Sequence, residues 1–327
     1  MKLRRMISIF LPLLVVAVMA GLCFGSAPLS ALELAAALTG GGNASHGIIL
    51  WQVRLPRVAA GVLAGIGLST AGALLQAVTA NELASPNIIG INSGAGLMVI
   101  LLLTLAPQAG AALPIVAFAG AFGAAQVILL VSGKLGSSKS NIVLIGIAIT
   151  TLLNAAISFL SLLDEGVLAQ YNHFTVGSLK GIRLTDLVLP AVIIAAALAA
   201  SMAMSARLAV LAIGDAAASA LGIRVKRLRL AAMACAAACA AAVVSFAGLL
   251  GFVGLVVPHI AKRLVGQQPA KLLPASGLVG AVLVVLADLL GRTLFAPSEL
   301  PVGILMSLVG APYFLILLCR RKAYAGV

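Results

Sequence analysis

The sequence predicts an all-α, polytopic membrane protein with about ten transmembrane helices and both termini in the cytoplasm. Its residues are 62% hydrophobic and only 9% charged, which leaves too few charges to cover a soluble protein of 327 residues. Its 34 glycines fit the close packing of helices in a bilayer, where small residues let two backbones approach each other. The basic residues gather between alternate apolar runs, as expected of a chain that crosses a membrane repeatedly.

Apolar runs of about 20 residues mark the predicted spans, because that length crosses the hydrocarbon core of a bilayer. We expect them at residues 6–25, 57–79, 88–106, 112–132, 141–163, 187–206, 229–248, 250–266, 273–291 and 301–319. Together they form a single transmembrane domain over residues 1–327. The first run resembles a signal peptide, but no cleavage site of small residues follows it, so we expect an uncleaved first helix.

An even number of spans places both termini on one side of the membrane. With the termini inside, most of the 21 Lys and Arg residues fall in cytoplasmic segments, as the positive-inside tendency requires. The net charge of +13 thus follows from membrane topology and contact with lipid, and it predicts no nucleic-acid partner. Two external segments are long, 26–54 and 164–186, and the first contains a helical pattern from Pro28 to Leu38.

The cytoplasmic segment 207–228 predicts a short helix that Asp215 caps and Gly222 ends. Ala218 and Leu221 stand three residues apart on this helix, so we expect both to project from one face. The helix is either an interfacial connector without a partner or a knob that docks into a cytoplasmic protein.

No energy source is encoded in the sequence. It lacks the G-x-x-x-x-G-K-[ST] phosphate loop, so we predict that the chain itself is not an enzyme. It also lacks a series of membrane carboxylates that could relay protons, since Asp288 is the one acid inside a predicted span and Arg292 lies within one turn of it. Helices packed by small residues with polar ends suggest a transporter, which would then borrow its energy from a partner. An ion-coupled secondary transporter or channel that works alone is the alternative.

The fifth predicted span carries a row of small polar side chains. They recur at three- and four-residue spacing and so share one helical face. These residues are Thr151, Asn154, Ser158 and Ser161. The face either supplies hydrogen bonds that hold helices together or lines the path of a polar substrate, which neutral groups would bind weakly enough to let it leave.

Two further patterns are weaker candidates for a site. His259 follows Pro258, and a hydrogen bond to a carbonyl group freed by the proline explains it better than metal binding does. Cys235 and Cys239 lie four residues apart among alanines, which is typical of small packing residues, although thiol chemistry is the alternative. The sequence thus predicts no catalytic residue, no metal site and no cofactor.

A series of short motifs follows in the order found in one family of transport proteins. They are Arg54–Arg57 (RLPR), Gly72–Gln76 (GALLQ), the turn Asn81–Pro86, Gly177–Leu179 (GSL), the loop Gly214–Gly222, Gly251–His259 (GFVGLVVPH), Ala287–Arg292 (ADLLGR) and Glu299–Gly303 (ELPVG). From about Arg54 to Leu318 the chain therefore resembles the FecCD-type permeases of ABC importers, which carry iron–siderophore chelates, haem or cobalamin.

The resemblance implies a homodimer of ten-span subunits around a central path, in the inner membrane of a bacterium. Two cytoplasmic ATP-binding subunits and an external substrate-binding protein are the implied partners. Family roles transfer to matching positions: docking of the binding protein to Arg54, Arg57 and Arg292, a cytoplasmic gate to Asn81 and Leu83, and ATPase coupling to Gly214, Asp215, Ala218, Leu221 and Gly222. Snorkelling of the three arginines toward lipid phosphates is the alternative to docking.

Three residues depart from the family pattern. Glu82 stands in the inner turn where the family has proline, Phe174 stands where an aromatic residue, often Trp, is common, and Gly291 replaces the usual alanine. None of them changes the predicted fold, but Glu82 makes the geometry of the inner turn an open question.

Overall fold

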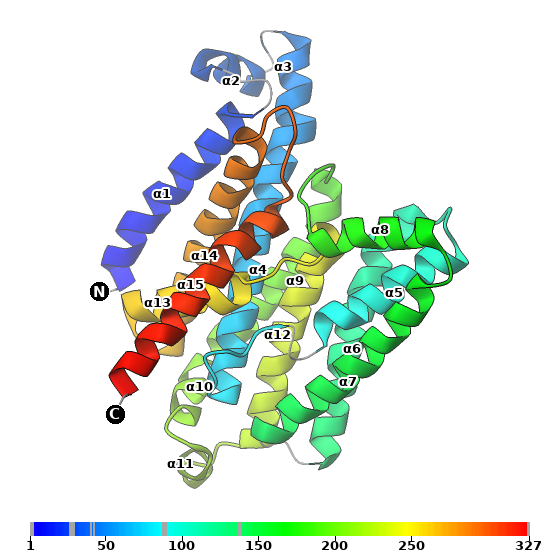
Figure 1. Cartoon of the computed structure of the whole chain (residues 1–327). Helices are drawn as coiled ribbons and strands as arrows, with labels where there is room; N and C mark the ends of the chain where they lie inside the picture. Colours follow the sequence, from blue (N-terminus) through cyan, green and yellow to red (C-terminus); the bar gives the residue numbers. More distant parts are fainter. Residues whose placement is uncertain are drawn as a thin grey trace.

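The computed structural model describes residues 3–25, 30–39, 41, 43–86, 90–135 and 139–325, and this part of the chain contains helices and no β-strand (Figure 1). The helices that coincide with predicted spans are α1 (Leu3–Cys23), α4 (Leu55–Thr79), α5 (Ile91–Leu105), α6 (Leu113–Leu135), α7 (Lys139–Ser161), α9 (Leu184–Ala203), α12 (Val225–Ala247), α13 (Val253–Val265), α14 (Pro269–Thr293) and α15 (Val302–Ala325). Shorter segments connect them: α2 (Ala31–Leu38), α3 (Ala44–Ile48), the π-helical η1 (Ile49–Arg54), the 3₁₀ turn η3 (Gly110–Ala112), α8 (Glu165–Val176), α10 (Ser205–Leu211) and α11 (Asp215–Ala220).

The all-α prediction is confirmed for the described residues. Seven helical stretches among them are long and apolar enough to cross a membrane: Leu3–Cys23, Ala44–Thr79, Gly110–Lys134, Ser140–Ser161, Leu184–Ala203, Val225–Ala247 and Pro269–Thr293. Helices α5 and α13 and the apolar part of α15, Val302–Ile316, are shorter. A membrane protein is therefore established, whereas crossing by these three helices stays a prediction.

Helix α4 lies at the centre of the bundle, where α12, α13 and α14 pack around it. Two glycines permit this packing. A Cβ atom on Gly65 would overlap the backbone of Gly280 in α14, and one on Gly72 would overlap the backbone of Gly254 in α13. Because no side chain fits at either crossing, the glycines of α4 set how closely the helices approach.

The outer segments contain more helix than the sequence analysis predicts. Helices α3 and η1 continue into α4, so the chain is helical where a loop was expected up to residue 54. Helix α2 begins after Ser30, whose hydroxyl accepts a hydrogen bond from the Glu33 N–H at 3.3 Å in a capping box. Pro28, the predicted start of this helix, lies outside the described residues.

Helix α8 forms within the external segment 164–186, where no helix was predicted. Asp164 begins it by accepting hydrogen bonds from the N–H groups of Gly166 (2.7 Å) and Val167 (3.3 Å). At its other end Gly177 has a φ of 68°, and its carbonyl accepts a hydrogen bond from the Gly303 N–H at 3.2 Å. This contact holds the end of α8 against the start of α15.

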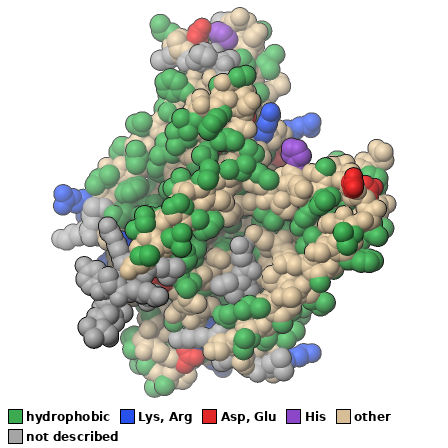
Figure 2. Space-filling model, viewed as in Figure 1, with side chains coloured by type: hydrophobic (Ala, Val, Ile, Leu, Met, Phe, Trp, Pro, Cys, Tyr) green, Lys and Arg blue, Asp and Glu red, His purple; other side chains and the backbone are tan. Residues whose placement is uncertain are grey.

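The two ends of the bundle differ in what they carry. Figure 1 shows α2 and α3 at one end, called here the outer end, and α11 at the opposite, inner end; α1 and α15 both run from the outer part of the bundle toward the inner side. In Figure 2, hydrophobic and uncharged side chains predominate over the middle of the visible face, as a surface in contact with hydrocarbon or with another membrane helix requires.

Candidate functional site

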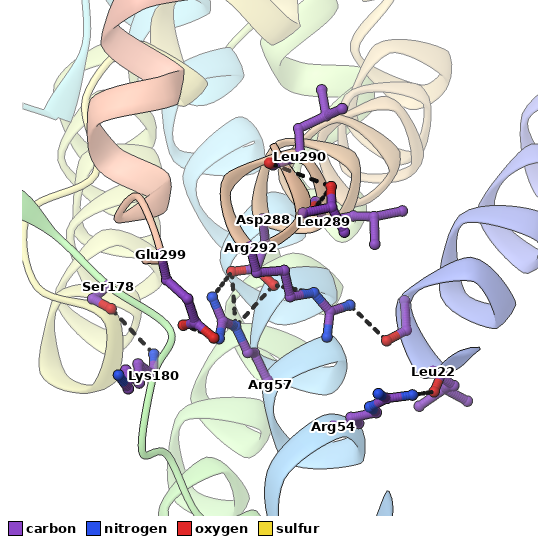
Figure 3. Close-up of polar contacts among 12 residues, drawn as sticks. Leu22, Arg54, Arg57, Ser178, Lys180, Asp288, Leu289, Leu290, Arg292 and Glu299 are labelled. Atoms are coloured by element: carbon purple, nitrogen blue, oxygen red, sulfur yellow. Dashed lines mark hydrogen bonds and ion pairs between the residues drawn. The ribbon is translucent and has the colours of Figure 1, made fainter. Parts of the chain in front are cut away.

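A buried cluster of ion pairs joins α4 to α14 at the outer end (Figure 3). Nε of Arg57 donates hydrogen bonds to both carboxylate oxygens of Asp288, at 3.0 Å each, and its Nη2 lies 3.0 Å from Oδ1. Its Nη1 donates a hydrogen bond to Oε2 of Glu299 at 2.8 Å. The Arg57 guanidinium thus binds two carboxylates, one from α14 and one from the loop before α15.

Two further arginines extend this cluster to the end of α1. Nε of Arg292 lies 3.7 Å from Oδ2 of Asp288, and its Nη2 donates a hydrogen bond to the carbonyl oxygen of Gly21. Nη1 of Arg54 donates hydrogen bonds to carbonyl oxygens in the last turn of α1, that of Leu22 among them. Carbonyl groups at the end of a helix have no partner within it, so Arg54 and Arg292 cap α1.

The three arginines lie together, as the predicted docking site requires, but their side chains are buried in the single chain. Arg54 is 3% exposed, Arg57 6% and Arg292 3%. A charge in a low-dielectric interior is tolerated only with partners, and here carboxylates and helix-end carbonyls supply them. Snorkelling toward lipid does not describe side chains that point into the protein. Their docking role stays a prediction.

The sequence analysis paired Asp288 with Arg292 alone and missed the stronger contact. The Arg292 ion pair exists, but Arg57, 231 residues earlier, lies closer to the carboxylate. Glu299 was seen as part of a motif and given no partner. The pairing of Arg57 with these carboxylates could have been predicted, since charges at corresponding ends of two membrane helices rarely stay unpaired.

A groove of about 980 Å³ opens beside this cluster at the outer end. Its lining includes Arg57, Glu299 and Lys180, together with His173 from α8. Burial tends to raise the pKa of Glu299, but the hydrogen bond and charge of Arg57 outweigh burial and bring that pKa below its ordinary value. The stabilisation from this ion pair is therefore present above the ordinary glutamate pKa and is lost as the pH falls through the lowered one.

Smaller cavities continue from the groove into the bundle. A cavity of about 510 Å³ shares wall residues of α8 and α15 with the groove, and its polar side chains are Asn92, Thr175 and Ser307. A third, of about 160 Å³, shares Asn92 with the second and reaches Ser85 in the inner turn. The side chains Asn92, Thr175, Ser307 and Ser85 are neutral and were not singled out in the sequence.

The polar row on α7 lies elsewhere on the chain. Thr151, Asn154 and Ser158 are exposed and Ser161 is half-buried, and none of them lines the three cavities just described. The hydroxyls of Thr151 and Ser161 donate hydrogen bonds to carbonyl oxygens one turn earlier in α7 itself, at 2.9 and 2.8 Å. These two hydroxyls therefore do not join helices within the chain, and a role in the path stays a prediction.

The inner turn keeps an ordered geometry despite Glu82. The Asn81 side chain accepts a hydrogen bond from the Leu83 N–H at 2.9 Å, which closes the turn locally. The Glu82 carboxylate lies 3.9 Å from the ammonium group of Lys262 in α13. Leu83 is 40% exposed, so its side chain is available to a facing surface, whereas the gate itself stays a prediction.

The cytoplasmic segment forms the expected short helix, α11, with a different start. Gly214, at φ 135°, occupies the cap position without a side-chain hydrogen bond. The carboxylate of Asp215 binds Nη2 of Arg229 in α12 instead, at 2.9 and 3.1 Å. The predicted cap is therefore wrong, because a buried guanidinium competes for the carboxylate. Gly222, at φ 77°, ends the helix as predicted.

Only one of the two predicted contact residues of α11 faces outward. Ala218 is fully buried against the chain itself, whereas Leu221 is 68% exposed. The prediction that both project together is wrong, since α11 packs with Ala218 toward α10 and α12. The role of the segment in coupling stays a prediction that now rests on Leu221.

A family model described as the FecCD transport family matches residues 13–320. The chain is 37% identical to the Fe(3+)-citrate import system permease protein YfmE of Bacillus subtilis, over 84% of this chain and 83% of the relative. It is 34% identical to the hemin transport system permease protein HmuU of Yersinia pestis, over 98% and 96%.

A solved structure agrees with the fold. The inward-facing structure of a proposed metal-chelate type ABC transporter matches with a TM-score of 0.85 and 29% identity, over 95% of this chain and 97% of that one. The family model extends over residues 13–320, the arginine cluster and the inner turn included. The chain belongs to the FecCD transport family.

Proposed function

We propose that the chain is the permease subunit of an ATP-driven importer of iron–siderophore chelates, haem or cobalamin. The observation that carries the proposal is its whole-chain likeness to permeases, with the family model over residues 13–320 and the hemin permease over 98% of the chain. Hydrolysis of ATP is assigned to a separate cytoplasmic subunit, because this sequence contains no phosphate loop.

The proposed arrangement is one transmembrane domain, residues 1–327, with ten crossings in the inner membrane of a bacterium. The inner end with α11 and both chain termini are placed in the cytoplasm because basic residues concentrate in these segments (Figure 1). Short helices such as α5 and α13 can complete a crossing with irregular backbone where that backbone is buried in protein.

The translocation path is proposed to follow the connected cavities from the outer groove to the inner turn. A second copy of the chain would close the open side, since α7 exposes large apolar side chains such as Leu152 (70%) and Phe159 (64%) beside its polar row. We propose that the row Thr151, Asn154, Ser158 and Ser161 faces this second copy and borders the part of the path between the two subunits, outside the cavities of the single chain. Neutral polar groups bind a large chelate weakly, which suits transport.

The proposed mechanism is alternating access driven from two partners. An external substrate-binding protein docks at the outer arginine cluster, and two ATPase subunits engage α11 of the two permeases. Nucleotide and docked protein must each bind one state of the permease better than the other, because only differential affinity shifts a conformational equilibrium.

An ion-coupled secondary transporter is the second candidate, and Asp288 argues against it. A proton-relaying carboxylate must be free to change its charge, whereas Asp288 is bound by Arg57 and lies near Arg292. Breaking these contacts during each cycle would uncover a buried cation.

Growth on defined nutrients tests the function. A deletion strain is expected to lose growth on one of three sources (an iron chelate, haem or cobalamin) and to regain it when this gene is restored in cells that also contain the partner ATPase. Restoration without a functional ATPase would contradict an ATP-driven importer and favour the secondary transporter.

The inner gate is tested by crosslinking at Leu83. In a Cys319→Ser background, Leu83→Cys is expected to crosslink across the proposed dimer in one nucleotide state and poorly in another, because the gate would open and close there. Leu168→Cys on α8 is the control, since Leu168 is also exposed and α8 belongs to the external segment 164–186. Equal crosslinking at position 83 in all states would count against a gate.

A further inference from the structure

The two carboxylates that bind Arg57 occupy different surroundings. The Asp288 side chain is 4% exposed and lies within α14, whereas the Glu299 side chain is 23% exposed and lies on the loop before α15. Asp288 binds the Nε and Nη2 side of the guanidinium, and Glu299 binds Nη1. One counter-ion therefore lies within a buried helix, and the other lies on a loop that leaves its side chain partly exposed.

Glu299 also lies where an outside molecule can reach it. Arg57, Lys180 and Glu299 all border the outer groove of about 980 Å³. Lys180 is exposed, and without Glu299 the groove would present the cations of Arg57 and Lys180. Such a site fits a carboxylate from a docking protein better than any neutral or basic group.

We propose that Glu299 is a displaceable placeholder: a carboxylate of the external binding protein replaces it on Nη1 of Arg57 during docking. The proposal rests on the docking role assigned to the arginine cluster under the proposed function. It explains how an arginine that is 6% exposed can still take part in docking, because exchange of one carboxylate for another never leaves the guanidinium unpaired.

Displacement of Glu299 would affect the proposed translocation path, because the loop that carries Glu299 leads directly into α15. Glu299 lies three residues before Val302, where α15 begins, and α15 carries Ser307 in the wall of the second cavity. A shift of this loop therefore acts on the first turns of a helix that borders the path. Docking of the binding protein and opening of the outer groove would then both depend on the ion pair between Arg57 and Glu299.

The test measures the affinity of the complete transporter, in nanodiscs, for the substrate-binding protein that supports its uptake activity. Glu299→Gln removes the competing charge and is expected to lower the Kd by about two- to fivefold, the range of a partly exposed ion pair. Glu165→Gln, which removes an exposed charge at the start of α8, is the matched control and should change the Kd less. Glu299→Asp keeps the charge and should stay near wild type.

The outcomes separate the placeholder from docking itself. An unchanged or raised Kd for Glu299→Gln, with normal binding by the wild type, overturns the placeholder and leaves docking intact. An equal gain in affinity for Glu165→Gln also overturns it, because general electrostatics then suffice. If the wild type binds normally and Arg54→Gln with Arg292→Gln changes nothing in a folded protein, the arginine cluster is not the docking site, and the proposed role fails first.

Discussion

Replacing Leu221 by arginine is expected to detach the ATPase from the permease while the membrane domain stays folded. The side chain is 68% exposed in the single chain, so the substitution leaves the packing of the bundle untouched. In a partner's groove it would place an unpaired charge out of water, at a cost of about 3–5 kcal/mol, or more than a hundredfold in affinity.

Arginine is chosen over aspartate because of the surroundings of Leu221. Arg207, Arg224 and Arg227 line a cavity of about 490 Å³ that Leu221 also borders, and an aspartate there could pair with one of them. Leu221→Met is the control, since it keeps apolar volume and should retain the ATPase. The measurement is co-purification of the ATPase together with substrate uptake; wild-type values for Leu221→Arg would refute coupling through α11.

Asp288→Asn is expected to cause the largest loss of stability of any single charge removal in the outer cluster. It leaves Arg57 with only Glu299 and removes the carboxylate near Arg292, so two buried guanidinium groups lose their shared partner. Removing one partner of a buried ion pair typically costs about 3–5 kcal/mol.

Thermal unfolding in detergent measures this effect. Glu299→Gln provides the comparison, because its side chain is 23% exposed and its ion pair is expected to contribute no more than about 1 kcal/mol. A melting temperature for Asp288→Asn equal to that of Glu299→Gln would show that the Asp288 contacts do not hold α4 to α14.

Most of the helices could be predicted because each one is marked by a continuous apolar run in its own sequence. An apolar run such as Val225–Ala247 indicates a membrane helix without knowledge of its neighbours. Helix α8 was not predicted because its sequence contains too many polar residues to form an apolar run. Asp164, which caps the helix, was the one local indication of its start. The burial of Ala218 could not be predicted from the six residues of α11, because it depends on how the short helix packs against α10 and α12.

The site was harder to predict for a related reason. Clustering of Arg54, Arg57 and Arg292 followed from the family resemblance, but their burial depends on which groups fold against them. Asp288 and Glu299 come from segments more than 230 residues later, and no local pattern links them to Arg57. Neutral cavity residues such as Asn92 look like any other polar residue in an apolar chain.

The separation of Arg57 and Asp288 has a consequence for biogenesis. The ribosome produces the arginine 231 residues before its carboxylate, so α4 enters the membrane while its counter-ion does not yet exist. Until α14 is inserted, the guanidinium must remain at the aqueous interface, because a lone charge within the hydrocarbon costs several kcal/mol. Arg57 therefore gains its buried carboxylate partner only after α14, the second-last long helix of the chain, has been synthesised.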